Sequence, residues 1–381
     1  MLNNFCFQNP TKLIMGKGMI AQLSKEIPAD KKIMITFGGG SVKRNGVYEQ
    51  VKEALKNHNT VEFWGIEPNP AIETLREAIA LGKAEKVDFL LAVGGGSVID
   101  GTKLISAGLL YDGDAWDLVK KGKADTTVPL GTVLTIPATG SEMNDGAVIS
   151  CKETKEKYAF FSNFPKFSIL DPEVTFSLPD YQIACGIADT FVHVMEQYLT
   201  KAGESRVMDR WAESILQTLV EIAPKIKENK QDYQNMADFM MCATMALNGF
   251  IALGVSQDWA THMIGHEVTA LTGLTHGHTL VIILPGTMDV LRQQKGEKIM
   301  QVGARVFGVS SGTHDFRINE TIRKTREFFN SLGLTTSLSE NNIGREVIDE
   351  IERRFNERDV HFGEDGLVTG TVAKEILNKV Y

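Results

Sequence analysis

Short apolar runs alternate with helical patterns along the first half of the chain. The runs at 32–37, 61–64 and 88–93 are rich in β-forming residues, and each leads into a stretch with helical spacing, such as 47–56 and 71–84. Residues 131–136 and 167–170 resemble further strands. This alternation predicts a Rossmann-like parallel sheet with helices on its faces.

The pattern changes near residue 180. From there, apolar residues recur at intervals of three and four over 182–199, 207–226 and 236–253, which is helical periodicity. We therefore expect an α/β domain at 1–179 and an all-helical domain at 180–381. The length of 381 residues is consistent with two domains of usual size.

Composition excludes several classes of partner and location. The net charge of −8 and the lack of a basic run argue against nucleic acid or an anionic membrane as the main partner. The four cysteines show no metal or redox spacing, which suits a reducing compartment. The N-terminus lacks the pattern of a signal peptide, and no apolar run reaches the roughly 20 residues of a membrane span. We expect a soluble, cytoplasmic protein.

Two predicted strands run directly into Gly-Gly-Gly-Ser. The first turn is Gly38, Gly39, Gly40 and Ser41, and the second begins at Gly94 and continues through Gly95, Gly96 and Ser97. Ligands of open parallel sheets bind at the carboxyl ends of strands, where glycine lets the backbone approach a phosphate and the next helix offers free N–H groups. The turns therefore indicate a dinucleotide site in the N-terminal domain; the alternative is two tight structural turns.

The first turn also bears on cofactor choice. Proteins that prefer NAD place an acid where it accepts a hydrogen bond from the ribose 2′-hydroxyl. Residues 38–42 include no acid, and Lys43 and Arg44 follow. This pattern favours NADPH over NADH, unless both cations are only solvated charges.

Acid and histidine residues recur at helical spacing in the second half. Asp189 and His193 lie four residues apart, and His262 and His266 repeat that spacing. His276 follows, so four of the eight histidines fall between residues 262 and 278. A carboxylate with imidazoles suits one divalent metal, Fe²⁺ or Zn²⁺. The strings differ from the metalloprotease patterns H-E-x-x-H and H-x-x-E-H.

Together these strings resemble the iron-containing (group III) alcohol dehydrogenase family, from about Phe7 to the C-terminus. The resemblance rests on residues 94–103, 137–142, 170–172 and 188–193, and on His262-x-x-x-His266 followed by His276-Gly277 and Leu284-Pro285. Residues 38–43 and 257–262 are similar to the NADPH-dependent aldehyde reductase and butanol dehydrogenase branch.

The resemblance implies roles for individual residues. Asp189, His193, His262 and His276 match the metal ligands, and His266 matches a histidine beside the metal and the nicotinamide. Further matches concern the cofactor: Gly95, Gly96 and Ser97 at the pyrophosphate, Asp100 close by, Gly39 where NAD-preferring relatives have aspartate, and Asn69, Thr139, Ser141 and Lys157 as additional contacts. The family fold is similar to that of dehydroquinate synthase, and dimers are common. His278 is an additional histidine that could compete as a ligand, although we expect it to lie beside the site or at the surface.

We therefore expect a reversible alcohol dehydrogenase that uses NADPH and one divalent metal to reduce small aldehydes to primary alcohols. The cation would polarise the carbonyl, and His266 would relay the proton, unless it is only a packed helical histidine. Two other enzyme classes remain open. A lyase of dehydroquinate synthase type needs many cations, yet residues 231–291 contain no Lys or Arg. A metal-dependent hydrolase would need no nicotinamide. A non-catalytic metal or nucleotide binder is the third alternative.

Overall fold

The computed structural model describes residues 2–381, which divide into two compact units. The sheet unit consists of Gln8–Pro179 and Gln231–Thr244. The helical unit consists of residues 2–7, Asp180–Lys230 and Met245–Tyr381. A parallel sheet in the N-terminal half and helices in the C-terminal half confirm the predicted fold class.

The sheet unit contains a six-stranded sheet, all of whose neighbouring strands are parallel. Its spatial order is β1-β8-β5-β4-β2-β3. The strands are β1 (Lys12–Met15), β2 (Lys32–Phe37), β3 (Asn59–Phe63), β4 (Phe89–Gly94), β5 (Leu130–Leu134) and β8 (Phe167–Leu170). The sequence did not predict β1 or the antiparallel hairpin of β6 (Gly146–Cys151) and β7 (Glu156–Phe161).

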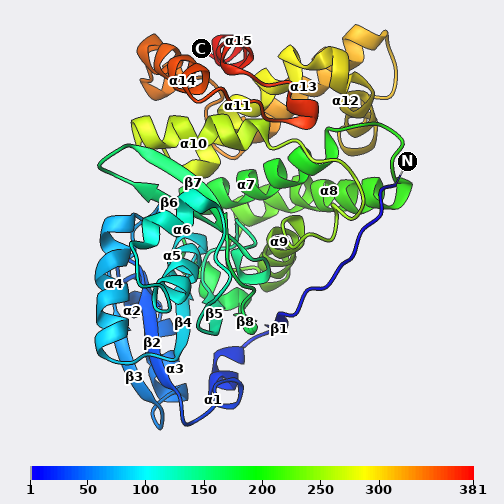
Figure 1. Cartoon of the computed structure of the whole chain (residues 1–381). Coiled ribbons are helices and arrows are strands. Elements are labelled where there is room, and N and C mark those ends of the chain that lie inside the picture. Colours follow the sequence, from blue (N-terminus) through cyan, green and yellow to red (C-terminus); the bar gives the residue numbers. More distant parts are fainter. Residues whose placement is uncertain (1) are drawn as a thin grey trace. The chain divides into compact units, whose positions relative to one another are not determined.

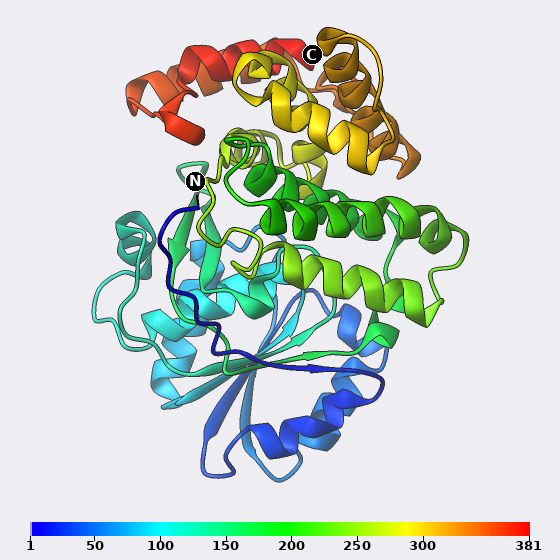
Figure 2. The same ribbon diagram turned by 90° about the vertical axis from the view of Figure 1, so that its right-hand side faces the viewer.

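Helices cover both faces of this sheet (Figure 2). Every residue of β4 is buried, which explains its continuous apolar sequence in place of an alternating one. One face packs against α1 (Leu23–Glu26), α2 (Ser41–Arg44) and α3 (Val47–Ala54). The other face packs against α4 (Ile72–Ala84), α5 (Gly96–Gly108) and α6 (Ala115–Lys121).

The direction of winding reverses between β2 and β4. From β2 the chain continues outward to β3, whereas from β4 it continues to β5 on the opposite side. Because β2 and β4 are neighbours with Phe37 paired to Val93, the glycine turns that follow them lie side by side at one edge. This is the switch point at which open parallel sheets bind their ligands.

The helical unit is built from long helices, labelled in Figure 1. α7 packs against α8 and α11, and α10 packs against α11. The helices are α7 (Asp180–Tyr198), α8 (Arg206–Glu228), α10 (Ala260–Thr272), α11 (His276–Val290), α12 (Arg292–Val306), α13 (His314–Ser331), α14 (Arg345–Glu357) and α15 (Gly370–Lys379). Among residues 2–381, no helix combines the length and apolar character needed to cross a membrane.

One predicted helix is shorter than expected. The helix predicted over 236–253 is α9 (Tyr233–Ala246), and residues 247–259 form turns and extended chain. Gly249 and Gly254 have left-handed φ angles of 85° and 66°, which glycine adopts easily and which end helical geometry. Apolar periodicity over this segment therefore predicted more helix than the backbone allows.

Five short 3₁₀ helices complete the described elements: η1 (Met19–Gln22), η2 (Ser141–Met143), η3 (Pro172–Ser177), η4 (Ser339–Asn341) and η5 (Glu364–Gly366).

Candidate metal centre and nucleotide-binding turns

Helix α7 has three polar side chains that are buried inside the helical unit. Asp189, His193 and Glu196 follow one another at intervals of four and three residues, so they lie on one face of the helix. All three side chains are buried, and most of the other buried residues of this helix are apolar. Buried charged groups need partners, and here the partners come from α10 and α11.

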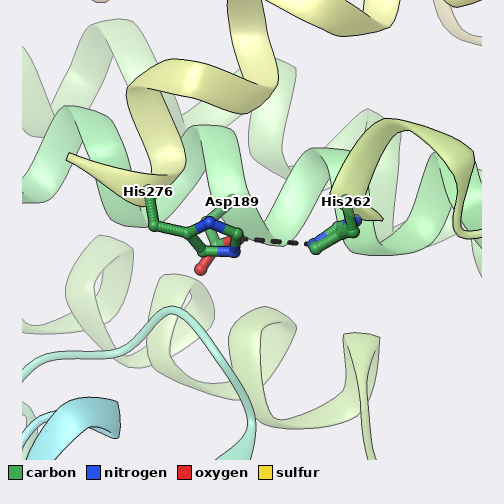
Figure 3. Close-up of side chains that lie close together, drawn as sticks. All are labelled: Asp189, His262 and His276. Carbon is green, nitrogen blue, oxygen red and sulfur yellow. Dashed lines mark ion pairs between the residues drawn. The ribbon is translucent and has the colours of Figure 1, made fainter. Parts of the chain in front are cut away.

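Three of the side chains predicted as metal ligands converge on one point (Figure 3). Ligand atoms of Asp189, His262 and His276 all lie within 4.8 Å of one another. Nε2 of His262 and Nε2 of His276 are each 3.8 Å from Oδ1 of Asp189. A carboxylate oxygen and two imidazole nitrogens at this spacing can hold a divalent cation between them.

His193 lies beside this group without belonging to the set within 4.8 Å. Its Nδ1 is 3.6 Å from Oδ1 of Asp189, and its ring stacks on His262 with centroids 4.6 Å apart. Burial lowers the pKa of His193 to about 4, so its imidazole is neutral at pH 7. A neutral imidazole is the form that binds metals.

The residues present fit a metal ion. Nδ1 of His193 and Nε2 of His262 are buried and make no hydrogen bond within residues 2–381. Leaving a buried polar atom without a partner costs about 1–3 kcal/mol. A cation bound between these nitrogens and Asp189 supplies the missing partner, so the donor set suits Fe²⁺ or Zn²⁺.

Glu196 is a site residue that the sequence analysis missed. Its Oε1 accepts hydrogen bonds from the backbone N–H and from Nδ1 of His262, at 2.7 and 3.1 Å. Burial lowers the pKa of His262, but the Asp189 and Glu196 carboxylates outweigh burial and raise it. The spacing Asp189, His193, Glu196 was the signal that would have revealed this residue.

The turn that begins α10 is held in a strained conformation. Trp259 has a left-handed φ of 69°, which is rare for a bulky residue. Asp258 braces this turn: its Oδ1 accepts from the backbone N–H of Ala260, and its Oδ2 accepts from Lys295 at 2.7 Å. The Trp259 ring then lies edge-on to His262, with centroids 5.2 Å apart.

The start of α11 shows why glycine follows His276. A Cβ on Gly277 would lie 2.4 Å from the backbone carbonyl oxygen of Cys185 on α7, closer than atoms can approach. Glycine therefore allows the helix that carries His276 to pack directly on the helix that carries Asp189. His266, on α10, is buried with its ring 5.2 Å from that of His276.

His278 does not join the three-residue group. Its Nδ1 is hydrogen-bonded to the Tyr181 hydroxyl at 3.1 Å, and its Nε2 faces the carbonyl oxygen of Thr335 at 3.1 Å. Burial lowers its pKa. Both ring nitrogens thus have partners other than Asp189, in agreement with a position beside the site for His278 and not with a ligand role.

In the sheet unit, the two glycine turns differ in their surroundings. A Cβ on Gly96 would lie 2.3 Å from Oγ1 of Thr139, and a Cβ on Gly95 would lie 3.0 Å from Cβ of Ile136, so there is little room for side chains where α5 begins. A Cβ on Gly39 would meet nothing within 4 Å. Gly40 has a left-handed φ of 91° and opens into α2, which carries Ser41 and Lys43.

Three predicted cofactor residues gather beside the second turn. The backbone N–H of Asn69 donates to the Ser97 hydroxyl at 3.3 Å, and Lys157 donates to Oδ1 of Asn69 at 2.9 Å. Asn69 itself adopts a left-handed φ of 56° in the loop after β3. These groups meet next to the N-terminus of α5, whose free N–H groups suit an anion.

Asp100 and Ser141 form a network beneath this turn. Ser141 donates to Oδ1 of Asp100 at 2.6 Å, and the backbone N–H of Val148 donates to Oδ2 at 2.9 Å. Lys103, fully buried, donates to Ser141, and burial lowers its pKa to about 8. Burial raises the pKa of Asp100. With both oxygens occupied by protein donors, Asp100 braces the loop that carries Thr139 and Ser141.

The chain has a parallel sheet of the type that binds nucleotides and a group of one carboxylate and two imidazoles that can hold a metal. A profile described as "Iron-containing alcohol dehydrogenase" matches residues 10–172, and its C-terminal counterpart matches residues 183–378. The chain belongs to the iron-containing alcohol dehydrogenase family, which makes it an oxidoreductase. This membership favours the oxidoreductase over the lyase and the hydrolase that the sequence left open.

Individual relatives match over nearly their whole length. The chain is 47% identical to the "NADPH-dependent aldehyde reductase YqhD" of Escherichia coli, covering 98% of this chain and 99% of that protein. It is 44% identical to the "Probable NADH-dependent butanol dehydrogenase 1" of Bacillus subtilis, covering 92% of each. The crystal structure of E. coli YqhD superposes with a TM-score of 0.98 at 46% identity, over 100% of this chain and 99% of that one.

Proposed function

We propose that this protein reduces small aldehydes to primary alcohols with NADPH and one divalent metal, and runs in reverse when cofactor ratios favour it. The observation that carries the proposal is the convergence of Asp189, His262 and His276 within 4.8 Å in a chain of this family. His193 completes the proposed ligand set, since its neutral imidazole lies against both Asp189 and His262. The metal is proposed as Fe²⁺ or Zn²⁺ on the chemistry of these donors.

Asp189, His193, His262 and His276 would hold the cation, which would supply polarisation of the aldehyde oxygen, and NADPH bound at the glycine turns would supply the hydride. The protein's own part is to orient these groups and to exclude water. One carboxylate and three neutral imidazoles carry a single negative charge, so they balance only half the charge of a divalent ion. His266 is proposed to deliver the proton to the product oxygen from its ring, because imidazole exchanges protons readily near neutral pH.

Residues of the sheet unit are proposed to bind NADPH. Gly95, Gly96 and Ser97 would take the pyrophosphate, where there is little room for side chains and α5 begins. Asn69 and Lys157 would contact the cofactor beside this turn, with Asp100, Thr139 and Ser141 supporting the loop. The residues proposed at the 2′-phosphate are Gly38, Gly39, Gly40, Ser41 and Lys43.

The substrate is proposed to be small and uncharged. Residues 231–291, which include His262, His266 and His276, contain no Lys or Arg that would grip an anionic substrate. Aldehydes with short alkyl chains suit such surroundings. A homodimer is proposed on the resemblance to the family, and sedimentation of the purified protein tests it.

The experiment that tests the function is a panel of short aldehydes with NADPH and with NADH, run alongside metal analysis of the same sample. We expect consumption of one NADPH per aldehyde, a lower rate with NADH, and about one iron or zinc ion per chain. Removal of the metal by a chelator should abolish turnover, and its return should restore it. Aldehyde turnover without consumption of nicotinamide would contradict the proposal.

A further inference from the structure

A stack of aromatic rings stands beside the first glycine turn. Phe37 is the last residue of β2, and Trp64 follows the end of the neighbouring strand β3. Their rings are parallel to within 14°, with centroids 4.1 Å apart. Tyr48, on α3, adds a third ring whose centroid is 5.6 Å from that of Trp64.

The Trp64 ring is fixed on several sides. Its Nε1 donates to Oε2 of Glu62 at 3.0 Å, and the Tyr48 hydroxyl and Lys52 both donate to Oε1 of that carboxylate. Burial raises the pKa of Glu62, but these donors outweigh burial and lower it. The Glu62 carboxylate is therefore already paired with Lys52 and hydrogen-bonded to Trp64 and Tyr48.

The ammonium group of Lys43 lies on the Trp64 ring. Nζ of Lys43 is 4.1 Å from the centroid of Trp64 and 5.4 Å from that of Tyr48. Because Phe37 covers one face of Trp64 in parallel stacking, Lys43 occupies the other face. Within residues 2–381, no acid pairs with Lys43. The lysine is thus held by aromatic faces and keeps its charge uncompensated.

We infer that Trp64 positions Lys43 to bind the 2′-phosphate of NADPH, an inference that rests on the proposed function. Lys43 lies three residues beyond Gly40, in the turn where Gly39 leaves open space. A flexible lysine loses rotamer freedom when it grips a phosphate. A cation–π contact that restricts the side chain beforehand reduces this loss. Trp64 is therefore a positioning residue for cofactor choice, acting through Lys43.

The experiment measures binding of 2′,5′-ADP and of AMP, which differ by the 2′-phosphate, to the metal-loaded protein. For Trp64→Leu we expect binding of 2′,5′-ADP to weaken about three- to tenfold, with AMP binding unchanged. Trp64→Phe should give an intermediate loss, because phenylalanine binds cations less well than tryptophan. Lys56→Met is the matched control, since it removes a lysine of the same unit that is paired with Glu53 and donates nothing to Glu62.

A double substitution distinguishes positioning from general damage. If Trp64 acts through Lys43, adding Trp64→Leu to Lys43→Met should cause little further loss of 2′,5′-ADP binding. Equal weakening of AMP and 2′,5′-ADP, or full additivity of the two substitutions, would overturn the inference. Failure of the proposed function is distinguishable, because the unaltered protein would then show no NADPH-dependent turnover of aldehydes.

Discussion

One oxygen of Glu196 accepts two hydrogen bonds from His262, from its backbone N–H at 2.7 Å and from its Nδ1 at 3.1 Å. This pairing places the imidazole proton on Nδ1 and leaves Nε2 directed toward Asp189. The carboxylate of Glu196, on α7, therefore orients His262, a proposed metal ligand on α10.

For Glu196→Ala we expect metal affinity to fall about 10- to 100-fold, because hydrogen bonds to ligating histidines typically contribute that much. Competition with a fluorescent chelator measures the affinity. The matched control is Glu213→Ala, another buried glutamate of the helical unit, whose partners are Tyr198 and Arg305. An unchanged affinity in Glu196→Ala would show that His262 needs no such support.

The proposed ligands themselves are tested by Asp189→Ala and His276→Ala. We expect each variant to lose bound metal and turnover, because each removes one of the four proposed ligands and breaks the group that converges within 4.8 Å. NADPH should still bind, since the glycine turns belong to the sheet unit. Elemental analysis and fluorescence titration with NADPH measure the two properties. Stoichiometric metal in both variants would refute the ligand assignment.

His266 is proposed to move the proton. His266→Ala should lower kcat about 10²- to 10⁴-fold, the usual range for loss of a general acid, while metal content stays the same. The pH profile of kcat should lose one ionisation as well. Full activity with an unchanged profile would place the proton relay elsewhere.

Gly39 offers a direct test of cofactor choice. Gly39→Asp fits the backbone, because an added Cβ meets nothing within 4 Å. A carboxylate there repels a 2′-phosphate and accepts a hydrogen bond from a 2′-hydroxyl, so kcat/KM should shift toward NADH by at least tenfold. Gly39→Ala serves as the uncharged control. The reading of this turn is wrong if the ratio of NADPH to NADH efficiency stays constant.

Because Lys103 is buried, we expect the free energy of unfolding to vary with pH in the alkaline range. Its pKa is about 8 in the folded protein, because burial disfavours its charge, against 10.5 when it is exposed. The unfolded chain then binds more protons between pH 8 and 10.5, so the contribution of Lys103 to stability rises with pH across this window. The full difference is about 3 kcal/mol, at roughly 1.4 kcal/mol per pH unit.

Comparison with Lys103→Met isolates this contribution, because cysteines and tyrosines also titrate in that range. Denaturant unfolding at several pH values gives the free energy of unfolding for both proteins. We expect the difference between them to change by a few kcal/mol from pH 8 to 10.5. If the free energies of unfolding of the two proteins change equally with pH, burial does not lower the pKa of Lys103.

The sequence predicted the strands that are long or continuously apolar and the helices that present one apolar face. It missed β1, an edge strand whose residues are exposed or half-buried. It also missed the β6–β7 hairpin, because the buried and half-buried positions of β6 alternate without a matching alternation of apolar and polar residues in Gly146–Cys151. At the site, Asp189 and His262 were recognisable because helical spacing preserves which residues share a face. Glu196 lies on the same face of α7 as Asp189 and His193, so spacing could have marked it, but its bond to His262 on α10 could not be foreseen. Trp64 was not singled out, because its role depends on a contact with Lys43 from another element.

The reversal of winding between β2 and β4 separates two properties of the nucleotide site. The turn after β2 leads toward β3, and the turn after β4 leads into α5 and β5, so the two loops share an edge but no segment of chain. On the proposed assignment of the two turns, substitutions after β2 alter the contacts to the 2′-phosphate and leave the turn proposed for the pyrophosphate unchanged.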